Sequence, residues 1–469
     1  MTESLKKLAL WTKEGETIYG INTGVGALSD VRIEGEKLNQ LQLNIVRSHS
    51  TGVGPYFSEE EARAIVLLRA HMLSQGYSGV RPLVVKTLLS LLNKNLIPLI
   101  PQKGSVGASG DLAPLAHLAL ALIGEGEVIF KSKKVPAQRG LRLAKISPLK
   151  LEGREGLALI NGTQVMTALS SLNLLKAERL FKLFNVASAL SLEAIQGSKK
   201  AFDPDLHLLR PHEGQKIVAK NILRLIQGSH IQKNHEFCGR VQDSYSFRCI
   251  PQVHGSSQDA LQSVKKIVEV ELNAITDNPV LFSQKNKWIS GGNFHGQYLA
   301  QAMDFLSIAT TTLVNISERR IEKLLDPKFS GLPPFLVQGL GLDSGLMLAH
   351  VTAAALASEN KVLSHPASVD TIPTSANKED HVSMGVHAAR KTKEILSNAE
   401  EVLAIEFLAA SQGIECLRPL KTSPVLEKIM SLIRSKVPPI EKDRIFSQDI
   451  TTMKTLFSSF LSSIERIIP

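Results

Sequence analysis

Long stretches of apolar residues at helical spacing dominate the second half of this 469-residue chain. Apolar residues that recur every three or four positions form one face of a helix, and several long patterns of this kind are typical of helical bundles. Hydrophobic residues make up 43% of the sequence and aromatic residues only 5%, which favours helix over sheet. We therefore predict a mainly α, multihelical fold. Long helices are expected at 157–196, 258–275, 295–325, 345–365 and 386–414.

The length of the chain suggests more than one domain. We expect an N-terminal part at 1–197, built from shorter helices and glycine-rich loops. The second part, at 198–469, is expected to hold the long-helix bundle and the C-terminal helices. Residues 125–148 are expected to form a turn-rich or hairpin excursion. Shorter helices are expected at 3–17, 38–48, 60–73, 82–92 and 111–123.

Charge and composition argue against several classes of protein. The formal net charge is +10, but Lys and Arg are dispersed and no basic run carries interleaved aromatic residues, so no nucleic-acid partner is expected. No run of about 18 uncharged apolar residues occurs, which predicts no membrane partner. The 13 histidines lack ligand-type spacing, so no metal is expected. Three scattered cysteines, Cys238, Cys249 and Cys416, fit reduced thiols in a cytoplasmic protein.

One glycine-rich stretch, from Gly104 to His117, contains residues with unusual chemical potential. The amide nitrogen of Gly110 has no side chain beside it, so it can attack the Ala108 carbonyl in a tight turn. Loss of one water closes a five-membered ring, and loss of the Ser109 hydroxyl as a second water leaves an exocyclic methylene. The product is a methylidene-imidazolone, an electrophile for amines. Ala-Ser-Gly alone is equally compatible with a flexible loop, and no Gly-Lys-Ser/Thr follows to indicate phosphate binding.

The full stretch resembles the signature of the histidine and aromatic amino acid ammonia-lyase family, and six motifs between Tyr19 and Ser383 follow the family's order. The resemblance implies that Ala108, Ser109 and Gly110 form the methylidene-imidazolone, with no external cofactor. It also implies the multihelical fold of the aspartase/fumarase-like lyases and a homotetramer with shared active sites. A helix that begins just after Gly110 would direct its positive end towards the ring, where negative charge develops during the reaction.

A second glycine-rich loop, Tyr19-Gly20-Ile21-Asn22-Thr23-Gly24, contains a single tyrosine. A phenol can act as a general base if neighbouring groups lower its pKa. The loop resembles the family's Tyr-Gly-Ile-Asn-Thr-Gly motif, which implies that Tyr19 is the base or proton shuttle. Val25 departs from the phenylalanine that is usual there, and we expect this to alter packing and leave the chemistry intact.

Two residues far apart in the chain bear on substrate choice. Ser48-His49 resembles the Ser-His pair of the histidine lyases. At this position the tyrosine lyases have a pair that looks like His-Leu, and the phenylalanine lyases have one that looks like Phe-Leu. Glu379 matches the carboxylate that histidine lyases place beside the substrate imidazole. An imidazole buried against an aromatic wall would lack a hydrogen-bond partner, at a cost of ~1–3 kcal/mol. The resemblance therefore implies L-histidine as the substrate.

Three further motifs supply the remaining site residues. Asn161, in Asn-Gly-Thr-Gln, matches the family residue that orients the substrate amine and the ring. Arg248 is suited to a substrate carboxylate, since a guanidinium can donate two parallel hydrogen bonds. Tyr245, three residues earlier, is implied to contact the reacting centre, and Gln242 and Phe294 are assigned to substrate binding.

The resemblance implies non-oxidative conversion of L-histidine into trans-urocanate and ammonia, the first step of histidine degradation. Either Tyr19 or Tyr245 would remove the β-proton. Two alternatives stay open. A tyrosine or phenylalanine ammonia-lyase, or a related aminomutase, would share the ring-forming residues. A non-catalytic scaffold paralogue is suggested by the start of the chain, where only 18 residues precede Tyr19 and the tyrosine loop is expected to be loosened.

Overall fold

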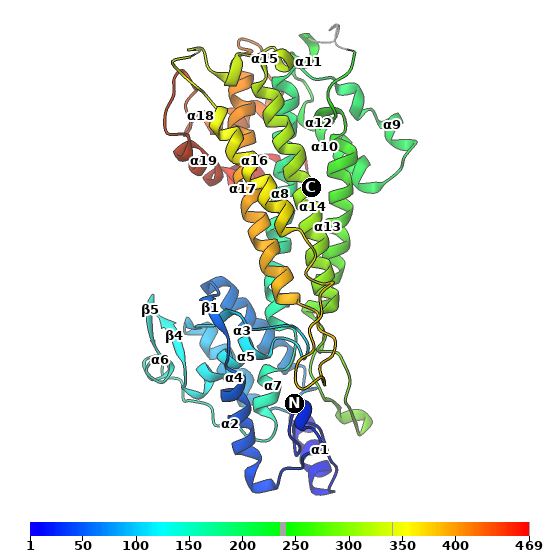
Figure 1. Ribbon diagram of the computed structural model, residues 1–469, viewed down its shortest axis with the longest axis vertical. Helices are drawn as coiled ribbons and strands as arrows, with labels where there is room; N and C mark the ends of the chain where they lie inside the picture. The colour runs from blue at the N-terminus through cyan, green and yellow to red at the C-terminus, as the bar shows by residue number, and fades with distance from the viewer. Residues whose placement is uncertain (235–240, 340, 469) are drawn as a thin grey trace. The chain divides into compact units, whose positions relative to one another are not determined.

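The computed structural model describes residues 1–234, 241–339 and 341–468, and it confirms the mainly α prediction (Figure 1). Cys238 lies outside the described residues. The chain divides into two compact units, and each is assembled from three segments, so a single cut of the chain does not separate them. Unit 1 comprises Met1–Leu172, Lys266–Asp304 and Pro366–Arg390, and unit 2 comprises Asn173–Lys265, Phe305–His365 and Lys391–Pro469.

Unit 1 contains the shorter helices, and the first five lie close to the positions expected from the sequence. They are α1 (Thr2–Lys13), α2 (Leu38–His49), α3 (Glu59–Ser74), α4 (Pro82–Asn93), α5 (Leu112–Ile123), α6 (Ala137–Leu143) and α7 (Glu155–Ile160). Local chemistry explains several of their ends. The hydroxyl of Ser58 and the carboxylate of Glu61 form a capping box at the start of α3. Pro82 occupies the first turn of α4. Gly124, with φ +87°, ends α5 in the left-handed conformation that glycine allows.

Three small antiparallel sheets complete unit 1. Strand β1 (Val53–Tyr56) pairs with β3 (Pro101–Lys103), and β6 (Val280–Phe282) pairs with β7 (Lys287–Ile289). The third sheet has the order β2-β4-β5, from β2 (Leu96–Pro98), β4 (Glu127–Phe130) and β5 (Lys133–Pro136). The β4–β5 hairpin pairs Glu127 with Pro136 and Phe130 with Lys133, so the hairpin expected within 125–148 is present.

The helix expected at 157–196 is broken, and this part of the prediction is wrong. Helix α7 ends at Ile160 and α8 (Gln164–Ala194) begins four residues later. The break occurs because Gly162 adopts φ +137°, a conformation outside the helical region. Gly162 instead forms a parallel β-bridge with Gly110. The apolar periodicity on both sides conceals this break, which brings the Asn-Gly-Thr-Gln motif to the electrophile loop.

The N-terminal helix anchors the tyrosine loop. Leu8 and Trp11 of α1 pack into a buried cluster with Ile18, Ile21 and Leu281. Within the loop, the Asn22 side chain accepts a hydrogen bond from the Ile18 amide at 2.8 Å and donates one to the Glu16 carbonyl at 2.7 Å. The conformation of the loop is therefore fixed by apolar packing against α1 and by the hydrogen bonds of the Asn22 side chain.

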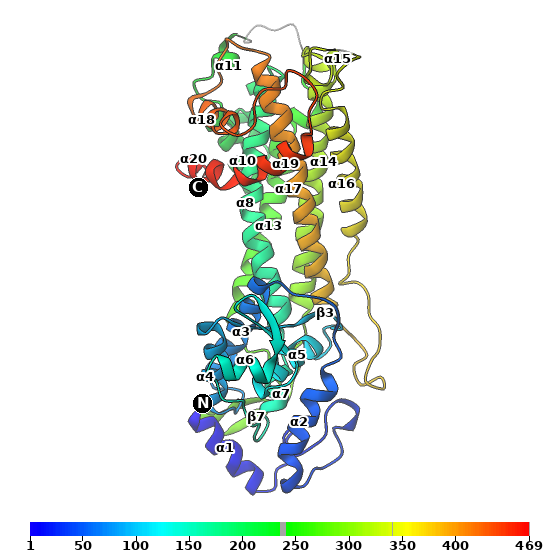
Figure 2. The same cartoon turned by 90° about the vertical axis from the view of Figure 1, so that its left-hand side faces the viewer.

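Unit 2 contains the bulk of the long helices. In both views, α8, α13 (Ile250–Leu272), α14 (Gln297–Leu325) and α17 (Gly385–Glu415) run side by side there (Figure 1, Figure 2). These four helices contribute residues to both units. The other helices of unit 2 are α9 (Pro204–Leu208), α10 (Glu213–Leu225), α11 (His230–Asn234), α12 (Tyr245–Arg248), α15 (Pro327–Ser330), α16 (Met347–Leu363), α18 (Pro424–Arg434), α19 (Phe446–Thr455) and α20 (Phe457–Ile464).

A fully buried ion pair joins two long helices inside unit 2. Arg320 on α14 donates from Nε and Nη2 to the Glu406 carboxylate on α17, at 2.6 and 2.9 Å. Ser191 and Ser317 donate to the same carboxylate. Arg320 also donates from Nη1 to His254 Nε2 at 3.2 Å. Burial and the neighbouring guanidinium hold the His254 pKa well below its usual value, so the ring is the neutral acceptor that this bond requires.

Replacing Glu406 with glutamine is expected to lower the free energy of unfolding by ~3–5 kcal/mol, because it leaves the buried Arg320 charge without a counter-ion. Urea unfolding followed by circular dichroism measures the loss. Glu213→Gln is the control, because Glu213 pairs with Lys216 on an exposed turn of α10 where ion pairs contribute ~0–1 kcal/mol. A similar, small loss for both variants would contradict a structural role for the buried pair.

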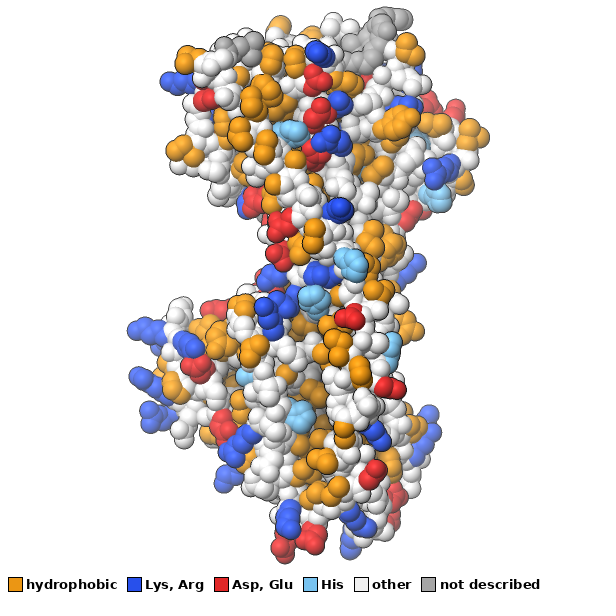
Figure 3. All heavy atoms as spheres, viewed as in Figure 1, with side chains coloured by type: hydrophobic (Ala, Val, Ile, Leu, Met, Phe, Trp, Pro, Cys, Tyr) orange, Lys and Arg blue, Asp and Glu red, His pale blue; other side chains and the backbone are white. Residues whose placement is uncertain are grey.

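On the face shown in Figure 3, Lys and Arg side chains are interspersed with acidic and hydrophobic ones on both units. Within the described ranges, no helix combines the length and the apolar character needed to cross a membrane.

Candidate active site

The Ala108-Ser109-Gly110 loop lies between β3 and α5, and its backbone requires glycine. Gly107 and Gly110 have φ values of +72° and +76°. A Cβ atom at Gly110 would lie 2.2 Å from the Gly162 carbonyl oxygen, a contact that no side chain tolerates. The same carbonyl accepts a hydrogen bond from the Asp111 amide at 2.8 Å. The loop is thus pressed against the break between α7 and α8, and its residues fit a cyclised backbone in which Gly110 carries no side chain.

Asp111 holds this arrangement together from the first residue before α5. Its buried carboxylate accepts hydrogen bonds from the amides of Val165 and Met166, both at 2.9 Å, at the start of α8. Ser105 donates to the other carboxylate oxygen at 3.2 Å. Burial raises the pKa of Asp111 to about 7, although the amide hydrogen bonds oppose this shift. Asp111 is not among the site residues predicted from the sequence, although it directly follows the Ser-Gly pair.

Asn161 contacts the candidate electrophile directly. Its side-chain nitrogen donates to the Ser109 carbonyl oxygen at 3.1 Å, and its side-chain oxygen is buried without a partner among the described residues. The Ser109 carbonyl is the oxygen that an imidazolone ring would retain. Asn161 therefore places a hydrogen-bond donor where negative charge would develop on such a ring, and an unused acceptor beside it.

Glu379 reaches the same loop from a distant part of the chain. The Ser109 hydroxyl donates to Glu379 Oε1 at 2.8 Å, and Thr374 donates to Oε2 at 2.7 Å. The segment that carries Glu379 is tied to the loop because Met384 donates its amide to the Val106 carbonyl at 2.8 Å. Ser383 also donates to the Gly107 carbonyl at 3.0 Å. The carboxylate is thus held at the serine side chain.

Tyr19 interacts electrostatically with Glu379, but its surroundings do not lower its pKa as a general base requires. Its phenol oxygen accepts a hydrogen bond from the Gly26 amide at 3.0 Å. Burial raises the Tyr19 pKa, the Gly26 amide partly opposes this, and the negative charge of Glu379 raises it further. Burial and the Glu379 charge therefore oppose the lowered pKa that a general base at Tyr19 would need.

A cleft of about 300 Å³ opens at Ser109 in unit 1. His49 lies on its wall, and His49 Nδ1 is 2.8 Å from the Ile45 carbonyl oxygen. A carbonyl can only accept, so the His49 Nδ1 carries a proton in this contact. The lining residues are Ser48, His49, Thr51, Gly104, Ser105, Val106, Ala108, Ser109, Gly110, Leu112, Ala113, Thr374 and Glu379.

The described lining of the Ser109 cleft does not include Gln242, Tyr245, Arg248 or Phe294. Gln242, Tyr245 and Arg248 belong to unit 2, whereas the Ser109 loop belongs to unit 1. The Arg248 guanidinium stacks on the Tyr245 ring at 4.4 Å, and the Tyr245 side chain is 70% exposed. Phe294 belongs to unit 1, but it is absent from the described residues that line the Ser109 cleft.

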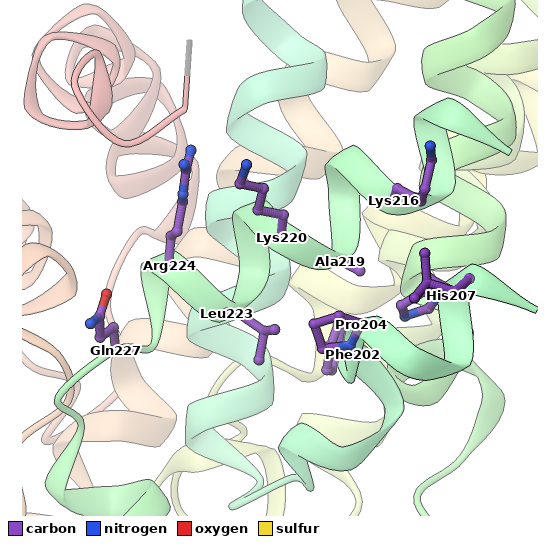
Figure 4. Close-up of a pocket in the computed structure, with 10 residues that line it drawn as sticks. Phe202, Pro204, His207, Lys216, Ala219, Lys220, Leu223, Arg224 and Gln227 are labelled. Carbon is purple, nitrogen blue, oxygen red and sulfur yellow. The ribbon is translucent and has the colours of Figure 1, made fainter. Parts of the chain in front are cut away.

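A larger pocket, of about 440 Å³, lies in unit 2 between α9 and α10 (Figure 4). Phe202, Pro204 and Leu223 give it an apolar lining, and Lys220 and Arg224 extend from α10 beside it (Figure 4). Its lining residues include none of the three ring-forming residues, so its volume does not make it the reaction site. The ring-forming residues identify the smaller cleft at Ser109 as the candidate active site.

The chain belongs to the aromatic amino acid lyase family, whose model matches residues 1–435. That match includes the Ser109 loop, Asn161 and Glu379. The chain is 51% identical over 441 residues to a histidine ammonia-lyase from Caldanaerobacter subterraneus subsp. tengcongensis, covering 94% of this chain and 86% of the relative.

Solved structures agree with this assignment. The histidine ammonia-lyase of Trypanosoma cruzi superposes with a TM-score of 0.93 at 44% identity, covering 100% of this chain and 89% of the other. A tyrosine aminomutase of Streptomyces globisporus superposes with a TM-score of 0.92 at 39% identity, covering 99% and 93%. The fold is therefore shared by relatives with different named substrates, and the substrate has to be argued from the site.

Proposed function

We propose that this chain is a histidine ammonia-lyase that converts L-histidine into trans-urocanate and ammonia. The observation that carries the proposal is the Glu379 carboxylate, held 2.8 Å from the Ser109 hydroxyl in a cleft that also contains His49. A carboxylate accepts hydrogen bonds, and the substrate imidazole has an N–H group to donate. The names of the curated relatives support the same substrate.

The reactive group in this proposal is made from the chain itself. The Gly110 nitrogen attacks the Ala108 carbonyl carbon, one water is lost there, and a second leaves with the Ser109 hydroxyl and the Ser109 α-proton. Support comes from the positive φ of Gly110 and the close approach of Gly162, which leave room for no side chain. Once formed, the methylidene-imidazolone supplies an electrophilic carbon for the substrate amine.

The neighbouring side chains then have separate tasks. Asn161 donates to the oxygen on which negative charge develops, and its unpartnered oxygen accepts from the substrate amine. Arg248 binds the substrate carboxylate, assisted by Gln242, and Phe294 packs against the substrate. The β-proton passes to Tyr19 or Tyr245 as the C–N bond breaks and ammonia leaves.

We propose that these residues meet in a homotetramer, in which Gln242, Tyr245 and Arg248 of one subunit complete the site of another. Exposed apolar side chains on two helices of unit 2 support an interface there, because large apolar patches mark association surfaces. Phe305 and Ile308 on α14 are 48% and 46% exposed, and Leu348 and Val351 on α16 are 60% and 53% exposed.

The experiment is an ultraviolet time course of the purified protein with L-histidine, L-tyrosine and L-phenylalanine in parallel. Urocanate absorbance should grow with L-histidine alone. Replacing Glu379 with glutamine should lower kcat/KM for L-histidine by about 10–100-fold, because a hydrogen bond to a charged group contributes ~1.5–3 kcal/mol. Glu125→Gln, which removes a surface partner of Arg47, is the control and should leave kcat/KM within about twofold.

Coumarate or cinnamate formation would instead identify a tyrosine or phenylalanine lyase, and a β-amino acid product would identify an aminomutase. Intact mass reports maturation independently, because the mature chain is lighter than its sequence by two waters. A full-mass chain that acts on none of the three amino acids would favour the non-catalytic scaffold.

A further inference from the structure

Behind Asn161 lies a charged residue to which the reaction described above gives no task. Arg69 is on α3, and its side chain is fully buried. Its Nη2 donates to the backbone carbonyl of Asn161 at 2.6 Å. Among the described residues, its Nε and Nη1 have no hydrogen-bond partner. A buried guanidinium with two unsatisfied donors is unfavourable for stability, so its presence calls for another explanation.

The two carboxylates that interact electrostatically with Arg69 already have other hydrogen-bond partners. Asp277 binds Arg154 through both carboxylate oxygens, at 2.9 and 3.0 Å. Asp111 accepts from the α8 amides and from Ser105. Both carboxylates attract Arg69 at longer range, and Arg154 repels it. Arg69 thus lacks an ion pair of its own within the described part of the chain.

The charge on Arg69 nevertheless persists at neutral pH. Burial lowers the Arg69 pKa to about 10, which still leaves the guanidinium protonated under ordinary conditions. Arg154 provides a comparison inside the same unit. It is equally buried, but it pairs with Asp277 and donates to the Ser78, Asn278 and Pro279 carbonyls. Arg154 therefore has an ion-pair partner, whereas Arg69 has none among the described residues.

We propose that Arg69 is a positioning residue for the lyase reaction. It fixes Asn161 through the Asn161 carbonyl, and its charge, which has no ion-pair partner among the described residues, adds positive potential at the Ser109 carbonyl oxygen. The connection runs in two hydrogen bonds, from Arg69 to the Asn161 backbone and from the Asn161 side chain to Ser109. Preorganised donors and charges of this kind stabilise a developing anion without reorganisation. This inference rests on the proposed function.

The test compares Arg69→Met with wild type. The methionine retains apolar volume and removes both the charge and the hydrogen bond. We expect kcat to fall by about 10–100-fold while KM changes by less than about threefold, because the interaction acts on the developing charge. Tm should stay constant or rise, since an apolar side chain replaces a buried, unpaired charge. Arg69→Lys, which keeps the charge, should restore part of kcat.

A second readout does not depend on the substrate. The rate at which a small thiol adds to the mature protein, followed by intact mass, should fall about tenfold in Arg69→Met, since the electrophile loses positive potential. Wild-type protein that acts on L-tyrosine would contradict the histidine assignment, and the thiol rates would still test Arg69.

Two outcomes would overturn the proposal. Unchanged kcat and thiol rates in Arg69→Met would remove any role for the charge. A lower Tm together with a failure to lose two waters would make Arg69 a folding residue, as expected for Arg154→Met, where Asp277 loses its partner. If Arg69→Met does not fold, Arg69→Gln, which removes the charge and keeps a hydrogen-bond donor, decides. A kcat and a thiol rate below wild type at unchanged mass support the role of the charge, and wild-type values of both refute it.

Discussion

Replacing Ser109 with alanine is expected to lower kcat for L-histidine by more than ~10³-fold, equivalent to at least ~4 kcal/mol of barrier. Alanine has no hydroxyl to lose, so no exocyclic methylene can form and the substrate amine has no electrophile. The urocanate time course measures the rate, and intact mass should show the loss of at most one water, that of ring closure. Ser90→Ala, on α4, is the control and should mature and act as wild type. Substantial turnover by Ser109→Ala would refute the chain-derived electrophile.

The same variant can test the shared active site. Coexpression of Ser109→Ala with Arg248→Ala should restore part of the activity, because some sites in a mixed tetramer then combine an intact Ser109 with an intact Arg248 from another subunit. Each variant alone should stay inactive. If mixed assemblies are isolated and remain inactive, the two residues act within one chain.

Replacing Asn161 with alanine is expected to lower kcat by ~10²–10³-fold, the usual effect of removing one donor from an anion-stabilising site. The donor in question is the Asn161 side-chain nitrogen, 3.1 Å from the Ser109 carbonyl oxygen. The ring should still form, because Ala108, Ser109 and Gly110 are unchanged, so intact mass should match that of mature wild type. This combination separates stabilisation of the reaction from maturation of the chain.

Asn44→Ala serves as the control for Asn161, because the exposed Asn44 side chain accepts a hydrogen bond from Gln40 on the same helix, α2. Its kcat should equal that of wild type. A mature Asn161→Ala enzyme with wild-type kcat would show that the Asn161–Ser109 hydrogen bond has no catalytic function.

The amino-acid sequence by itself determined the features that depend on near neighbours. Helical periodicity predicted α2, α4, α14, α16 and α17 to within a few residues, since apolar spacing reflects one buried face. The Ala-Ser-Gly chemistry was also local, because ring closure joins residues two positions apart. Sequence motifs further indicated that Asn161, His49 and Glu379 belong with Ser109, and the structure brings all three to one loop or its cleft.

The tertiary structure alone decided how those residues act. The break at Gly162 is invisible in an apolar pattern that continues on both sides, because a positive φ there depends on pairing with Gly110, 52 residues earlier. The raised Tyr19 pKa arises from burial and from a carboxylate 360 residues away. Arg69 carries no motif, and only its burial without a counter-ion beneath Asn161 distinguishes it. Contacts between distant segments and the burial of charge arise from packing, so they cannot be predicted from periodicity and spacing alone.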